Sequence, residues 1–269
     1  MPARLSSFSA LATPETGMQD SHHHQQHRRH NSSSSASGSL LLLAYLRRLV
    51  SPSQMDWEYT ARQMVLLVSA PSKVYELSKY RKSTRDQWAR DDPAFLVLLF
   101  AFMLASSVAY GIAFEMSSLG EFALLFFYAF LQVFVLGAFV ATATSTVANR
   151  RMRITDDAHG VEQHVEWLYA FDIHANAMFP AWLILSVLQY LLLPVLLHTS
   201  YLACVLSNSL YVCGMLAYVY ITHLGYRSMP FLERTQIFLM PALPIIMVCL
   251  LLTMLDMNLS RAMVWFVFG

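Results

Sequence analysis

The stretch AFLVLLFAFMLASSVAYGIAF, residues 94–114, decides the fold of this chain. It contains no Asp, Glu, Lys or Arg, and a helix of its length crosses the roughly 30 Å hydrocarbon layer of a bilayer. Backbone amides find no water in lipid, so a spanning segment is a helix or a strand of a closed barrel, and barrel strands alternate in polarity. This stretch does not alternate. It therefore predicts a transmembrane helix.

Four more stretches of the same kind follow along the chain. Each lacks Asp, Glu, Lys and Arg and is long enough to span a membrane. The five predicted spans are residues 94–114, 122–148, 177–197, 201–222 and 236–255. The composition agrees, because 56% of the 269 residues are hydrophobic and only 13% are charged. We therefore predict an all-α polytopic membrane protein with five transmembrane helices and cytosolic N-terminal amphipathic helices.

The basic residues predict the orientation of these helices, since Lys and Arg favour the cytosolic side of short loops. Of the 18 Lys and Arg residues, 12 precede the first span, three lie between spans two and three, and two lie between spans four and five. A cytosolic N-terminus therefore places 17 of the 18 in the cytosol and leaves residues 256–269 as a short lumenal tail. This tail holds a glycosylation sequon at Asn258, which we expect to be poorly modified because it lies close to the membrane.

The region before the first span divides into two parts. Residues 1–39 are rich in Ser and His and predict a disordered arm, whose histidines lack the fixed geometry of a metal site. Residues 40–93 predict a cytosolic amphipathic helical region, with one helix starting near Pro71. In this helix apolar and aromatic residues are interleaved with basic ones, namely Val74, Tyr75, Leu77 and Tyr80 with Lys73, Lys79, Arg81 and Lys82. Such a helix lies on an anionic bilayer surface or packs on the membrane bundle, and the sequence favours neither.

A charged segment, DQWARDDPAF at residues 86–95, leads into the first span. Asp92 is placed to cap the helix, and Pro93 suits its first turn. Trp88 is placed for the aromatic belt at the membrane surface. Asp86 and Arg90 are four residues apart and could pair on one helical face. The candidate interaction or structural residues here are Asp86, Gln87, Trp88, Arg90, Asp91, Asp92 and Pro93.

The loop between spans two and three gathers carboxylates and imidazoles. They are Asp156, Asp157, His159, Glu162, His164, Glu166, Asp172 and His174. Zinc binding is one interpretation, but the spacing puts no matching histidine on a helical face with the carboxylates. The sequence favours an interfacial helix with Trp167 and Tyr169 anchored at the headgroups. In this helix Glu166, Asp172 and His174 bond to neighbouring loops. The candidate residues are Glu166, Trp167, Asp172, His174 and Asn176, with no metal or cofactor.

Motifs spread from residue 45 to residue 255 match the pattern of one known family. They are Tyr45-Leu46-Arg47-Arg48-Leu49, Gln54-Met55-Asp56, Tyr80-Arg81-Lys82, Asp86 to Leu99, Glu166-Trp167, Tyr169 to Asp172, His174, Asn176-Ala177, Pro180, Gly225-Tyr226, Pro230-Phe231-Leu232, Pro241 and Pro244. Together they resemble the Unc-fifty (uncoordinated-fifty) family of eukaryotic Golgi membrane proteins.

The resemblance implies a multispan Golgi protein that acts in vesicular transport and is not an enzyme. It also implies links to Arf exchange factors, as in fungi, and to delivery of acetylcholine receptors to the cell surface, as in animals. The lipid bilayer, exchange factors and receptor cargo are therefore the expected partners. An adaptor that recruits cytosolic machinery should concentrate its polar surface in the cytosol, and this sequence does so.

A solute transporter and an RNA-binding membrane protein are the alternatives. Carriers usually need an ionisable residue within the membrane, and all five predicted spans lack Asp, Glu, Lys and Arg. Basic residues among aromatics also suit RNA, but no RNA-binding signature is present, and contact with a membrane explains the same charges. The sequence disfavours both alternatives and predicts no DNA binding.

Small residues recur at every fourth position in the first two spans. They are Ala101, Ala105 and Ala109 in the first span and Gly137, Ala141 and Ser145 in the second. Such faces let helices approach closely, either within one bundle or between two copies of the chain. The sequence favours packing within the bundle and leaves the oligomeric state open.

Overall fold

The computed structural model describes residues 55–154 and 163–268, which lie within one compact unit that begins at Arg48. Every named element in these residues is a helix, and their one isolated bridge joins Arg153 to Leu232. The all-α prediction is therefore confirmed. The predicted arm at residues 1–39 and the start of the predicted amphipathic region lie outside the described residues.

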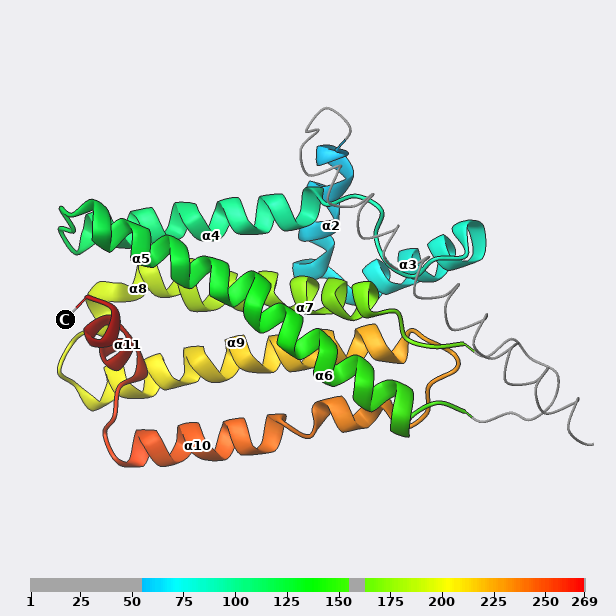
Figure 1. Ribbon diagram of the computed structural model, residues 1–269. Helices are drawn as coiled ribbons and strands as arrows, with labels where there is room; N and C mark the ends of the chain where they lie inside the picture. Colours follow the sequence, from blue (N-terminus) through cyan, green and yellow to red (C-terminus); the bar gives the residue numbers. More distant parts are fainter. Residues whose placement is uncertain (1–54, 155–162, 269) are drawn as a thin grey trace, which may run out of the picture. The chain divides into compact units, whose positions relative to one another are not determined.

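Among the described residues, five helices are long and apolar enough to cross a membrane (Figure 1). They are α4 (Ala94–Ala113); α5 (Leu119–Phe130), η2 (Leu131–Val135) and α6 (Leu136–Arg151) in one run; α7 (Trp167–Trp182), η3 (Leu183–Leu188) and α8 (Gln189–Leu196) in another; α9 (Tyr201–Arg227); and η4 (Thr235–Leu239) with α10 (Ala242–Met254). The protein is a polytopic membrane protein with the five spans that the sequence predicted.

The third spanning helix begins earlier than the sequence predicted. Its first residue is Trp167, whereas the predicted span begins at residue 177. The helix therefore contains Asp172, His174 and Asn176, which are all buried. Asp172 lies in the part of the helix that precedes the predicted span, and residues 177–197 themselves lack Asp, Glu, Lys and Arg. Buried polar groups are stable where each finds a partner, and hydropathy counts a residue without its partner.

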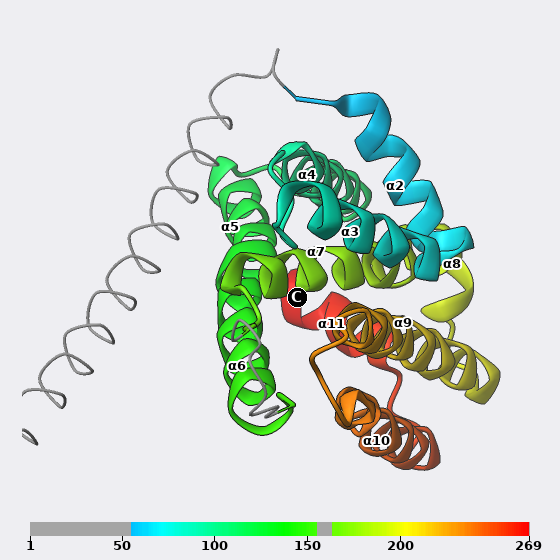
Figure 2. The same ribbon diagram turned by 90° about the vertical axis from the view of Figure 1, so that its right-hand side faces the viewer.

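Helix α7 is central to the bundle and contacts α4, α6 and α9 (Figure 2). Nearly all of its side chains are buried. Glycines permit the close contacts on two sides. A Cβ added to Gly137 of α6 would lie 2.7 Å from the His174 ring, and one added to Gly225 of α9 would lie 2.7 Å from Ile173. The backbones of α6 and α9 therefore approach α7 more closely than any larger residue would allow.

The two predicted faces of small residues have different surroundings. In α6, Gly137, Ala141 and Ser145 are buried within the bundle. In α4, Ala101 and Ala105 are exposed. The structure therefore shows packing within the bundle for the face on α6, and it shows none for these two alanines of α4.

Helices α2 (Trp57–Ser69) and α3 (Pro71–Arg85) precede the bundle and pack against it. Helix α2 runs across the direction of the spanning helices (Figure 1). The buried side chains of the two helices include Met64, Leu67, Val74 and Tyr75, and the exposed apolar ones include Val65, Val68, Leu77 and Tyr80. The region thus packs on the bundle and also presents apolar residues outward, so the two interpretations of the sequence do not exclude each other.

Beyond α10 the chain turns into α11 (Leu259–Phe268), a short apolar helix across one end of the bundle (Figures 1 and 2). Phe268 stacks on Phe114 at the end of α4, with ring centroids 4.5 Å apart. The predicted tail at residues 256–269 therefore contains a helix that packs on the spans.

Candidate functional site

The charged segment at residues 86–93 connects α3 to α4. Asp86 ends α3 in the left-handed conformation, with φ of 52°. Its carboxylate accepts a hydrogen bond from Lys82 Nζ at 2.8 Å, and this bond to a cation lowers the pKa of Asp86 below its usual value. The predicted pair between Asp86 and Arg90 is wrong. The helix ends at Arg85, so no helical face joins the two residues, and Asp86 is exposed while Arg90 is buried.

Arg90 turns inward and ties the segment to α7. Its backbone N–H donates to Asp172 Oδ2 at 2.6 Å, and its Nη2 donates to Asn176 Oδ1 and, at 3.4 Å, to the Asp172 carbonyl. The guanidinium Nε lies 3.8 Å from Asp172 Oδ2, and its carbon lies 4.1 Å from the centroid of the Phe95 ring. We call Arg90, Phe95, Asp172 and Asn176 the Arg90 cluster. Its three polar residues are at most 6% exposed, so their charges are balanced internally rather than by water.

Glu166 bonds to the two residues that precede Arg90 in the same segment. Its two carboxylate oxygens accept from the backbone N–H groups of Trp88 and Ala89 at 3.4 and 3.3 Å. The Trp88 carbonyl in turn accepts from Arg81 of α3 at 3.3 Å. Trp88 is buried against Tyr169, with ring centroids 5.7 Å apart. The prediction of Trp88 in the interfacial belt is therefore wrong, because its ring is packed inside the protein.

The two aspartates after Arg90 join neighbouring helix ends. Asp91 pairs with Arg85 at 2.5 Å. Asp92 accepts from the backbone N–H of Ala94 at 3.0 Å, as a cap would, and from that of Asp56 at 2.7 Å. The starts of α2 and α4 are thereby held together by one carboxylate. Two further candidate residues make no part of this network: Pro93 is buried immediately before α4, and Gln87 is partly buried.

The remaining candidates on α7 face other helices. His174 Nδ1 is 2.8 Å from the Tyr218 hydroxyl of α9. Trp167 is 40% exposed, as expected for an interfacial anchor, and its Nε1 donates to Thr142 Oγ1 at 2.9 Å. Tyr169 was expected beside it but is buried, with its hydroxyl 2.9 Å from Ser228 Oγ. The expectation that Glu166 and Asp172 bond to a neighbouring loop agrees with the structure, whereas His174 bonds to a helix.

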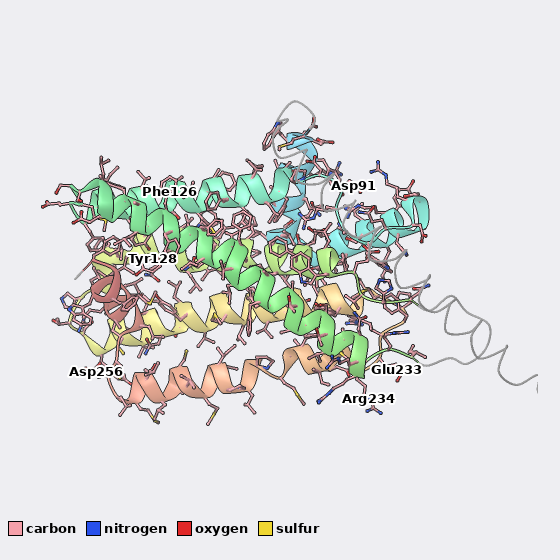
Figure 3. All side chains as sticks on the ribbon, in the orientation of Figure 1. Asp91, Phe126, Tyr128, Glu233, Arg234 and Asp256 are labelled. Carbon is pink, nitrogen blue, oxygen red and sulfur yellow. The ribbon has the colours of Figure 1, made fainter. Side chains whose placement is uncertain are left out.

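Two contributors to this end of the bundle were not among the predicted site residues. The Tyr75 hydroxyl of α3 donates to the Ile221 carbonyl of α9 at 3.0 Å, and burial raises the pKa of this hydroxyl. The loops after α6 and α9 also pair, because Glu233 N–H donates to the Met152 carbonyl at 2.7 Å. Figure 3 shows Asp91, Glu233 and Arg234 at this end and Asp256 at the other. Tyr75 could be recognised only as an apolar position of an amphipathic helix.

A metal centre finds no support in the described part of the chain. No three His, Cys, Asp or Glu side chains come together there in a way that could hold an ion. The acidic stretch from Asp156 to Glu162 lies outside the described residues. The described site is a structural hydrogen-bond network. It attaches the segment between α3 and α4 to the start of α7.

A second polar network lies at the end of the bundle near α11, and none of its residues was among the predicted site residues. Asn208 of α9 donates to Thr253 Oγ1 of α10 at 2.9 Å, and its amide oxygen accepts from Leu259 N–H at 3.0 Å. The hydroxyls of Ser207 and Ser260 are 2.8 Å apart. These residues lie in or beside apolar helices and carry no charge, so composition gives no signal for them. They attach α11 to the spans.

Comparison with known proteins gives one family. The UNC-50 family model matches residues 45–268 of the chain. The Protein unc-50 homolog of Dictyostelium discoideum is 42% identical over 226 residues, which are 84% of this chain and 87% of that protein. The Protein unc-50 homolog of Homo sapiens is 36% identical over 220 residues, which are 81% and 84% of the two chains. Protein unc-50 of Caenorhabditis elegans is 42% identical over 198 residues, which are 73% of this chain and 64% of that protein. No solved structure matches the chain.

Proposed function

Because this chain belongs to the UNC-50 family, we propose that it is a Golgi membrane protein that acts in vesicle-mediated and protein transport. It serves as a cytosol-facing adaptor for Arf-exchange or coat machinery and supports receptor delivery to the cell surface, without enzymatic activity. The observation that carries this proposal is that α2 and α3, with exposed apolar and basic side chains, are clamped to one end of the spanning bundle.

The exposed side chains of α2 and α3 have the composition of a partner-binding surface. Tyr80 is 68% exposed and Val65 is 65% exposed. We call six of the exposed apolar and basic residues of these helices the platform, namely Val65, Val68, Lys73, Leu77, Lys79 and Tyr80. Exposed aromatic residues are enriched at surfaces that bind proteins. Lysines beside exposed apolar residues also suit the anionic cytosolic leaflet, so the platform would work close to the membrane.

Residues of α3 and of the segment before α4 position this platform and do not themselves contact a partner. Arg81 of α3 bonds to the Trp88 carbonyl, Tyr75 bonds to α9, and Asp92 bonds to the first residues before α2. Each bond joins the platform helices to a segment that is itself fixed to the spans. A rigid surface loses less conformational entropy when a partner binds, which favours recruitment.

The proposal includes an orientation and a domain organisation. The basic residues put the platform in the cytosol and α11 in the lumen. The proposed parts are a disordered arm at residues 1–39, the cytosolic amphipathic region at 40–93, the membrane bundle at 94–255 and a lumenal tail at 256–269. The tail contributes α11.

Proximity labelling in cells tests the adaptor role. A labelling enzyme fused to the N-terminus should mark coat, Arf or exchange-factor proteins, and the same enzyme placed after Gly269 should not. We expect the double change Leu77→Ala and Tyr80→Ala to remove most of this labelling, because it deletes exposed apolar contacts of the platform. The matched control is Leu251→Ala with Met254→Ala on the exposed face of α10. N-terminal labelling that contains none of this machinery contradicts the proposal.

A further inference from the structure

A cavity of about 630 Å³ lies inside the bundle. Its walls come from α4, the run from α5 through η2 to α6, the run from α7 to α8, α9 and α11. Most of the lining side chains are apolar or aromatic, and none of the described residues that line it is Asp, Glu, Lys or Arg. The volume is within the range of pockets that bind small organic ligands. Without a lining charge the cavity does not suit an ion, and it suits a molecule with a large apolar body.

Gln189 supplies a polar group that the fold leaves unsatisfied. Its side chain lines the cavity and is 4% exposed, and its Oε1 has no hydrogen-bond partner among the described residues. Tyr211 of α9 also lines the cavity. The terminal torsion of glutamine is soft, so the oxygen can turn toward a bound donor. A buried acceptor without a partner is costly, and a ligand that donates a hydrogen bond there would recover that cost.

Several other hydroxyls in the lining are hydrogen-bonded within the protein. Tyr110 donates to the Ser186 carbonyl at 3.1 Å, and Ser107 donates to the Met103 carbonyl at 2.9 Å. Ser106 accepts from Trp182 Nε1 at 3.1 Å. Gln189 is therefore the group that most needs a donor from outside the protein.

The cavity opens toward lipid. Three of its lining side chains have large exposed fractions, namely Leu136 (47%), Met215 (41%) and Met263 (43%), so the cavity is not sealed within the bundle. They belong to α6, α9 and α11, and α6 and α9 are parts of spanning helices. A molecule that enters between these helices comes from the bilayer, so it must itself be soluble in lipid.

We propose that this cavity binds a neutral membrane lipid with a free hydroxyl group, such as a sterol, a diacylglycerol or a ceramide. The apolar body of the lipid lies against α4, α5 and α9, and its hydroxyl donates to Gln189 Oε1. Lipids with charged headgroups fit poorly because the lining offers them no ion pair. This inference does not depend on the trafficking role.

Photoactivatable lipids test the proposal on the purified full-length chain in phosphatidylcholine nanodiscs. Three alkyne-tagged probes are used separately: a sterol, a diacylglycerol and a ceramide. We expect at least one probe to label the protein saturably, with cross-links on peptides that contain cavity residues such as Met178 or Met215. The unlabelled lipid should compete about five-fold better than its O-methyl ether, which cannot donate the hydrogen bond. The probe that saturates identifies the lipid source.

Two variants and one matched control sharpen the test. Ala129→Phe places a ring in the cavity from α5 and should abolish saturable labelling, whereas Ala101→Phe adds the same ring on the exposed face of α4 and should not. Gln189→Leu should make the hydroxyl lipid and its ether compete equally. Thermal unfolding shows which variants are folded.

Several outcomes would overturn the proposal. The first two are labelling that does not saturate with any probe and cross-links confined to peptides outside the cavity. The third is that the O-methyl ether, or phosphatidylcholine, competes with the probe on the natural chain as well as the unlabelled hydroxyl lipid does. The fourth is undiminished labelling of folded Ala129→Phe. If a variant does not fold, the cross-link positions and the ether comparison on the natural chain decide the question.

Discussion

The backbone N–H of Arg90 lies 2.6 Å from the carboxylate of Asp172, although 82 residues separate the two in the sequence. This bond joins the segment before the first span to a helix in the middle of the bundle. It explains how a spanning helix can begin at Trp167 and still contain a buried aspartate. A carboxylate in that position is stable only with donors that the chain brings to it from elsewhere.

Removing the Arg90 side chain should destabilise the protein strongly. Arg90→Met leaves the Asp172 carboxylate with fewer partners, and breaking a buried pair costs about 3–5 kcal/mol. Asp172→Asn should also destabilise the protein, because it leaves the Arg90 guanidinium buried without a counter-ion, although the amide oxygen can still accept from Arg90 N–H. Thermal unfolding in detergent, followed by circular dichroism, measures both.

The matched control for Arg90 is Arg85→Met. Arg85 pairs with Asp91 but its side chain is 67% exposed, so the loss should be at most about 1 kcal/mol. The double change Arg90→Met with Asp172→Leu should recover part of the stability, since it removes both buried charges. Equal losses of stability for Arg85→Met and Arg90→Met would show that the Arg90 cluster stabilises the fold no more than an exposed ion pair does.

Gly137→Ala should separate α6 from α7. The added methyl would lie 2.7 Å from the His174 ring, so the helices must move, and overpacking of this kind costs about 1–3 kcal/mol. Gly120→Ala is the control, because its Cβ would meet only Ser118 Oγ at 3.4 Å. Unfolding temperatures of the two variants give the comparison. A stable Gly137→Ala protein would contradict the close approach at this position.

Asp86 should tolerate glycine better than a β-branched residue. Its φ of 52° is in the left-handed region, where glycine carries no steric cost and valine should cost about 1–2 kcal/mol. Asp86→Gly should therefore unfold at nearly the natural temperature despite losing the bond to Lys82, because that pair is exposed. Asp86→Val should unfold clearly earlier. The reverse order would show that the bond to Lys82, and not the backbone, matters here.

Glycosylation should report the orientation of the chain. A sequon tag at the N-terminus should stay unmodified, and one added after Gly269 should be modified. The natural sequon at Asn258 should stay unmodified, because its side chain is 7% exposed and donates to the Leu196 carbonyl at 2.7 Å. Gel mobility before and after endoglycosidase treatment measures all three, with Asn258→Gln as the control. The opposite tag pattern would reverse the proposed topology.

The site was predictable only where the signal is local. Asp92 beside a helix start and Glu166 before a charge-free run each suggest a cap or a bond to a loop, and the structure shows both kinds of bond. Trp88 looked interfacial because tryptophan near a span usually is. Its burial against Tyr169 depends on a residue 81 positions away, for which the sequence around Trp88 carries no signal.

By itself, the sequence determined that this chain is helical, that it crosses the membrane five times and that its basic residues lie mostly on one side. Each of these properties depends on a contiguous segment of the chain, because the hydropathy and charge of one segment decide whether it lies in lipid or in water. Only the tertiary structure decided where α7 begins, which charges are buried and where an internal cavity remains. Those features depend on pairs such as Arg90 with Asp172 and Gly137 with His174, whose energies exist only once distant segments are packed together.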